Sequence, residues 1–104
     1  MDNMRIDVGV YTSITIDLSE FDLTYIEKVI LTIKNYPDVK SEPVIEREFS
    51  ESKAHVITIT PEESLKLTEN ACYDFDKITL SGERYKITEN GKVVLRKGVG
   101  DCIE

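Results

Sequence analysis

Tryptophan is absent from this 104-residue sequence, and histidine and cysteine are scarce, with one and two residues respectively. Cys72 and Cys102 are too few and too far apart for a zinc site or a CxxC redox motif. In a reducing compartment we expect both to be free thiols, although a bridge between the last strands stays open. The lack of tryptophan also weakens a carbohydrate-binding interpretation, because such sites are usually built on aromatic platforms.

Long apolar runs are missing as well. The longest aliphatic runs hold three residues, at 29–31 and 93–95, so no segment is long enough to span a bilayer. The first residues, MDNMRIDVGVYTS, lack the continuous apolar stretch of a secretory signal peptide. We therefore expect a protein that is made in the cytoplasm and has no membrane partner. Later incorporation into an extracellular particle stays compatible with this expectation.

Basic residues are outnumbered, with 13 Lys and Arg against 20 Asp and Glu and a net charge of −7. This balance argues against a nucleic-acid partner bound through its phosphates. Residues 84–97 nevertheless carry five basic side chains and one acidic one, a local +4, which leaves −11 on the remainder. The candidate interaction patch consists of Arg84, Lys86, Lys92, Arg96 and Lys97. Its simpler interpretation is charge protection of a strand edge.

Alternation of apolar and polar residues dominates the chain and predicts about seven strands in one domain, residues 1–104. Apolar residues at even positions over 6–18 indicate one strand or two collinear strands broken near Thr12-Ser13. Glu89-Asn90-Gly91 is typical of a hairpin turn. Such a chain of short strands and turns favours an all-β, antiparallel β-sandwich, and a small barrel is the main rival.

One short helix is predicted at residues 60–67. Thr60 is a suitable N-cap, Pro61 suits the first helical position, and Glu63 is placed to close a capping box. A helix of this length depends on packing for its stability, and we expect Leu65 and Leu67 to supply it.

In residues 73–80, the apolar residues do not all fall on the same face of a regular strand. Ile78 and Leu80 alternate in phase with Asp74, whereas Tyr73 and Phe75 occupy the opposite phase, so burial of both apolar pairs requires a β-bulge near residues 76–77. The predicted core comprises Ile16, Leu31, Ile33, Ile57, Ile59, Leu65, Tyr73, Phe75, Ile87 and Leu95.

Few residues are suited to catalysis or metal binding. Asp74 and Asp76 share a strand face and offer oxygen ligands, but calcium needs six or more oxygens and no DxDxDG pattern occurs. We expect both carboxylates to face water. His55 and Cys72 would have to meet in space to act as base and nucleophile, and no GxSxG or HExxH motif is present. We therefore predict no catalytic, cofactor-binding or metal-binding residues, and no enzyme.

Several short motifs follow one another in a recognisable order. They are Asp22-Leu23, Thr32-Ile33-Lys34, ITITPEE at 57–63, Tyr73-Asp74-Phe75, Gly82-Glu83-Arg84-Tyr85 and GKVVL at 91–95. With this order and spacing, residues 14–99 resemble the immunoglobulin-like N-terminal domain of phage baseplate upper proteins and related tail components. The resemblance implies an immunoglobulin-like β-sandwich that docks subunits in a virion tail, and it implies no catalytic residues.

The favoured hypothesis is a prophage-derived structural or interaction module of a phage tail or baseplate. Its partners would be other phage structural proteins or further copies of the chain, and it would be associated with the virion. Two alternatives stay open. One is a β-sandwich that binds a small ligand or a carbohydrate, and the other is an acidic inhibitor that mimics nucleic acid.

Overall fold

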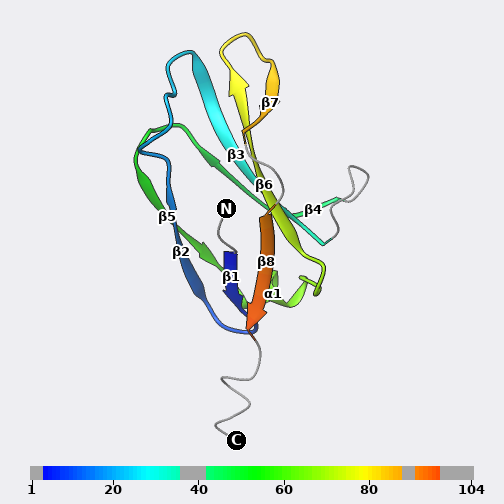
Figure 1. Cartoon of the computed structure of the whole chain (residues 1–104). Helices are drawn as coiled ribbons and strands as arrows, with labels where there is room; N and C mark the ends of the chain where they lie inside the picture. The colour runs from blue at the N-terminus through cyan, green and yellow to red at the C-terminus, as the bar shows by residue number, and fades with distance from the viewer. Residues whose placement is uncertain (1–3, 36–41, 88–90, 97–104) are drawn as a thin grey trace, which may run out of the picture.

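The computed structural model describes residues 4–35, 42–87 and 91–96, which form eight strands and one short helix (Figure 1). The strands are β1 (Met4–Asp7), β2 (Thr12–Asp17), β3 (Ile26–Lys34), β4 (Pro43–Phe49), β5 (Ala54–Ile59), β6 (Cys72–Thr79), β7 (Arg84–Lys86) and β8 (Gly91–Arg96), and the helix is α1 (Pro61–Leu65). The fold is all-β, as the alternation predicts.

The strands form two sheets. The larger sheet has the order β1-β8-β6-β3-β4, with β7 added beside β6, and the smaller sheet pairs β2 with β5. Every pairing is antiparallel except that of β1 with β8, which is parallel. The chain leaves the larger sheet through residues 8–11, where Gly9 has a φ of +84°. The expectation of collinear strands broken near Thr12-Ser13 is therefore wrong, because the two strands belong to different sheets.

The strands β7 and β8 lie along the same edge of β6 and run in the same direction. β7 pairs with residues 76–78, and β8 pairs with residues 72–73. They are therefore not the two arms of a hairpin, contrary to the prediction for Glu89-Asn90-Gly91, of which residues 89 and 90 lie outside the described residues. Gly91 has another role, because its backbone packs so closely on the ring of Tyr73 that a Cβ would clash.

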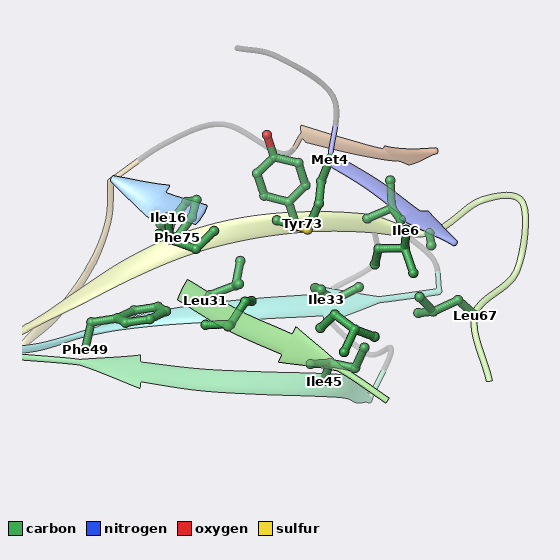
Figure 2. Packing of buried hydrophobic residues seen from close by; sticks show 14 of the residues in the cluster. Met4, Ile6, Ile16, Leu31, Ile33, Ile45, Phe49, Leu67, Tyr73 and Phe75 are labelled. Atoms are coloured by element: carbon green, nitrogen blue, oxygen red, sulfur yellow. The ribbon is translucent and has the colours of Figure 1, made fainter. Parts of the chain in front are cut away.

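Both sheets contribute side chains to a single hydrophobic core (Figure 2). Leu31 and Ile33 of β3 are fully buried, and Ile57 and Ile59 of β5 pack in the same cluster. Phe75 is buried with them, which confirms the register predicted for β6. The buried predicted residues are Ile16, Leu31, Ile33, Ile57, Ile59, Tyr73 and Phe75, whereas Ile87 and Leu95 are partly buried and pack against the core.

Leu65 is the clear error in the predicted core. Its side chain is 65% exposed, whereas that of Leu67 is 8% exposed and belongs to the core. The reason lies in the segment after the helix, where the Asn35 side chain donates to the Lys66 carbonyl at 3.0 Å and accepts from the Thr68 backbone N–H at 2.9 Å. These two bonds fix the backbone on both sides of Leu67 against the end of β3.

The predicted bulge near residues 76–77 is absent from β6, whose register with β3 and β7 is continuous there. The irregularity falls on β3 instead, between Ile26 and Lys28. Strict alternation then directs Ile78 and Leu80 away from the core, and Leu80 is exposed. The smaller sheet does not extend over this end of the larger one, where β3, β6 and β7 project beyond β2 and β5 (Figure 1).

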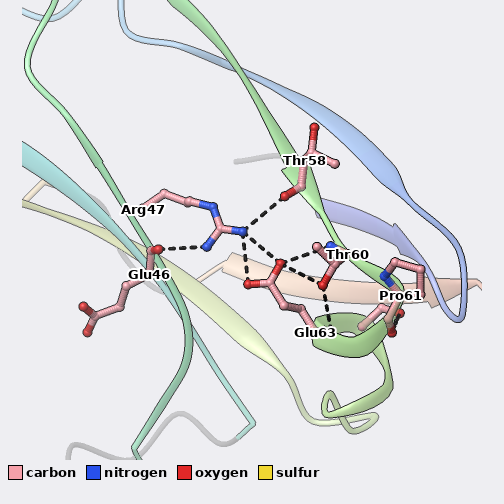
Figure 3. Close-up of polar contacts among 7 residues, drawn as sticks. Glu46, Arg47, Thr58, Thr60, Pro61 and Glu63 are labelled. Carbon is pink, nitrogen blue, oxygen red and sulfur yellow. Dashed lines mark hydrogen bonds and ion pairs between the residues drawn. The ribbon is translucent and has the colours of Figure 1, made fainter.

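An ion pair joins the larger sheet to the smaller one (Figure 3). Arg47 of β4 donates from Nη2 to both carboxylate oxygens of Glu63, at 2.9 and 3.0 Å, and to the carbonyl of Thr58 on β5 at 3.1 Å. Both side chains are more than two-thirds buried. We call this pair the Arg47–Glu63 clamp. It anchors the edge strand β4 to the end of β5 and to the helix.

The same carboxylate completes the predicted capping box. The backbone N–H of Glu63 donates to Thr60 Oγ1 at 3.1 Å, and Glu63 Oε1 accepts from the Thr60 backbone N–H at 3.0 Å. Burial acts to raise the pKa of Glu63, but the hydrogen bonds from Thr60 and Arg47 outweigh it and hold that pKa below its usual value of 4.5. The ionised form of Glu63 is therefore favoured by folding.

Leu67→Ala should destabilise the protein by about 2–5 kcal/mol because it removes buried atoms and leaves a cavity. Leu65→Ala, the same change two residues earlier, should alter the unfolding free energy by less than about 0.5 kcal/mol because the side chain is exposed. Urea unfolding of both variants measures the difference. Equal losses would show that the helix exit packs differently.

Glu63→Gln should destabilise the protein by about 1–2 kcal/mol at neutral pH, since glutamine can keep the capping box but loses the charged bond to Arg47. Because the folded pKa of Glu63 is lowered, its contribution is complete above pH 4.5 and is lost as the pH falls through the folded value. Unfolding of wild type and variant should therefore converge in acid. A gap that stays constant with pH would mean that the ionised carboxylate is not the stabilising group.

Candidate interaction surface

Asp74 and Asp76 lie on the outer face of the larger sheet, and each has a cationic partner on β7. The expectation that both carboxylates face water is wrong, because their side chains are only 17% and 14% exposed. Lys86 donates to Asp74 Oδ2 at 3.0 Å, and Arg84 Nε donates to Asp76 Oδ2 at 2.7 Å. The hydrogen bond from Lys86 to Asp74 raises the pKa of the Lys86 ammonium. Cross-strand ion pairs of this kind keep the two carboxylates beside protein cations.

Two neighbouring residues on this outer face are also buried. Ile30 and Thr32 of β3 are buried there although they face away from the core, and they lie opposite Asp76 and Asp74 in register. Among the described residues, no group of three or more His, Cys, Asp or Glu is placed to hold a metal ion. The chemistry of this face is that of paired charges.

The five residues of the predicted interaction patch do not form one surface. Arg84 and Lys86 are engaged with Asp76 and Asp74, whereas Lys92 and Arg96 lie on β8 at the other end of the sheet. Arg96 lies 3.7 Å from Asp7. Lys97 is outside the described residues. The patch is therefore divided into a neutralised half on β7 and a basic half on β8.

The basic half is extended by two side chains that the sequence pattern did not indicate. Lys34 and Lys92 flank Cys72 in one cross-strand row, and Arg5 lies opposite Val94 in the parallel pair of β1 with β8. Arg5 and Lys92 are exposed, and neither forms an ion pair with any residue that the structure describes. We call Arg5, Lys34, Lys92 and Arg96 the basic face.

His55 and Cys72 are not brought together. His55 lies on the smaller sheet, where its Nε2 is 2.8 Å from the Glu51 carbonyl and its ring contacts Phe49. Cys72 lies on the outer face of the larger sheet, and burial, together with the neighbouring Asp74, raises the pKa of its thiol. A raised pKa opposes formation of the reactive thiolate. Cys102 is outside the described residues.

A second surface is formed at the projecting end of β3 and β6. Tyr25 is 78% exposed, Leu80 is 68% exposed and Tyr85 is 47% exposed. The first two are neighbours, because the Leu80 backbone N–H donates to the Tyr25 carbonyl at 3.0 Å. Tyr85 donates its hydroxyl to Glu83 at 3.1 Å, so its ring is held beside the same turn. Three large hydrophobic side chains are therefore exposed to solvent at one end of the molecule.

The backbone at Tyr25 is unusual. Leu23 accepts a hydrogen bond from the Ile26 N–H at 3.0 Å, which closes a four-residue turn with Tyr25 in its third position at a φ of +66°. Glycine or asparagine is favoured at such a position, and an aromatic residue there is strained. Asp22 Oδ1 accepts from the Thr24 N–H at 2.9 Å and supports the turn. The turn holds the Tyr25 ring away from the core.

Acidic residues are frequent in the segments that carry Tyr25 and Leu80, whereas Lys77 Nζ lies 6.0 Å from the centre of the Tyr85 ring. Residues 21–27 and 79–83 contain Asp22, Glu27 and Glu83 and no Lys or Arg. All three acidic residues are exposed. We call these two segments, together with the Tyr85 side chain, the acidic tip.

No protein-family model matches the chain, and no relative is found among the curated proteins. In the described part of the chain, no helix has the length and apolar character needed to cross a membrane.

Millimolar calcium should leave the melting temperature unchanged, because Lys86 and Arg84 already neutralise the two aspartates and further oxygen ligands are needed. Thermal melts with calcium and with chelator test this. An upward shift with calcium that disappears in Asp74→Asn would establish a metal site on this face.

Proposed function

We propose that the chain is an interaction module of a phage tail or baseplate, with an immunoglobulin-like β-sandwich fold, and that it acts by contact with other structural proteins of the particle. The motif order from residue 14 to 99 supports the family. The arrangement of β1-β8-β6-β3-β4 opposite β2-β5 around one core supports a sandwich of this kind.

The acidic tip is the observation that carries the proposal. Large apolar side chains cost free energy in water, and exposed clusters of them mark contact sites. Tyrosine is enriched at the centres of protein interfaces because its ring is large and loses few rotamers on binding. Here Tyr25 and Leu80 are presented on turns fixed to the ends of paired strands and Tyr85 lies within β7, so little ordering is needed on association.

The charge arrangement disfavours the acidic mimic of nucleic acid. Such a mimic needs rows of unpaired carboxylates in place of phosphates, whereas Asp74, Asp76 and Glu48 on the larger sheet each have a basic partner. The exposed carboxylates of the tip lie in the same segments as exposed apolar side chains, a combination that suits a protein contact with a polar rim.

Mass spectrometry of purified particles tests the proposal. If a phage or prophage encodes the chain, its peptides should be found in particles released from that host, in a fixed ratio to the other tail proteins. A deletion should remove the tail or baseplate stage that needs the module. Particles that assemble normally and lack the chain would contradict the proposed function.

A further inference from the structure

The acidic tip and the basic face lie at opposite ends of the same two strands. The tip is at the start of β3 and the end of β6, whereas Lys34 ends β3 and Cys72, beside Lys92, begins β6. Eight residues of β6 separate them, which corresponds to about 25 Å at the usual rise of a strand. Between them, the β6–β7 ion pairs neutralise the sheet.

We propose that the acidic tip of one copy docks on the basic face of a second copy, in a head-to-tail contact. This inference rests on the proposed function and names a second copy of the chain as the partner. Asp22, Glu27 and Glu83 supply negative charge, and Arg5 and Lys92 supply exposed positive charge with no ion-pair partner in the described part of the chain. The opposite charges steer the encounter, and they suppress tip-to-tip contacts.

The apolar side chains of the tip would supply the attraction at short range. Tyr25 and Leu80 lose water on contact, and the exposed ring of Tyr25 offers a face to a guanidinium such as that of Arg5. The strained turn at Tyr25 is consistent with this use, because strain of this kind is found where a side chain must be presented for binding.

A contact between two different surfaces is heterologous, so each added copy leaves one free tip and one free basic face. The contact therefore repeats and builds a ring or a filament, which are the assemblies that a tubular or disc-shaped particle requires. A symmetric dimer would instead use the same surface twice.

Sedimentation at near-millimolar protein tests the contact directly. Wild type should form dimers and larger species at about 10 mM salt, where charges act over about 30 Å, and should return to monomer at about 1 M salt, where they act over about 3 Å. A wild type that is monomeric in both salts would overturn the proposal.

Two variants separate the two surfaces. Tyr25→Gly/Leu80→Ser removes the apolar centre of the tip, and glycine suits the positive φ, so its melting temperature should not fall. Arg5→Glu/Lys92→Glu reverses the basic face. Each variant alone should be monomeric at low salt, but an equimolar mixture should form a dimer and no larger species, because one partner keeps its basic face and the other keeps its tip.

Val56→Ser is the matched control, since Val56 is 69% exposed on the outer face of the smaller sheet. It should associate as wild type does. Association that persists in the tip variant, or that is lost in the control, would place the contact elsewhere. Particles that contain a monomeric chain would leave the proposed function in place and reject only the self-contact, whereas a self-associating chain absent from particles would reject the proposed function alone.

Discussion

The Arg47–Glu63 clamp is the contact on which the arrangement of the two sheets depends. A two-stranded sheet is marginal alone, so β2 and β5 need to be held against the larger sheet. Packing of apolar side chains supplies most of the free energy that holds the two sheets together, but it does little to fix how one sheet is oriented on the other. The clamp helps to fix this orientation, because the Arg47 guanidinium on β4 donates hydrogen bonds to the Thr58 carbonyl on β5 and to the carboxylate of Glu63. Helix, edge strand and smaller sheet are thereby joined at one partly buried point.

The position of the Arg47–Glu63 clamp goes with an end of the larger sheet that the smaller sheet does not cover. The smaller sheet is fixed near the helix, and the far end of β3, β6 and β7 extends past it (Figure 1). Tyr85 lies opposite Lys77, in the phase of the core residues, and is exposed at this end, whereas Leu80 is exposed because alternation places it on the outer face. On the outer face, cross-strand ion pairs neutralise Asp74 and Asp76 and separate a negative end from a positive one.

Local patterns predicted the elements well, because alternation and capping act between neighbours in the chain. The capping box of Thr60 and Glu63 and the burial of Phe75 are examples. Contacts between distant segments could not be predicted in this way. The burial of Leu67 in place of Leu65 depends on Asn35, and the exposure of Leu80 depends on the register of β6 with β3, which continues without the predicted bulge. The predicted patch was divided for the same reason, since only pairing shows that Lys86 meets Asp74.

We propose that the acidic tip and the basic face are the surfaces through which the protein makes contacts. Nuclear magnetic resonance of the labelled protein at rising concentration and low salt measures this residue by residue. Amide signals of residues 22–26 and 79–83, and those of β1 and β8, should shift together with concentration. Signals of β2 and β5 should stay in place. Shifts concentrated on the smaller sheet, or none at all, would contradict the claim.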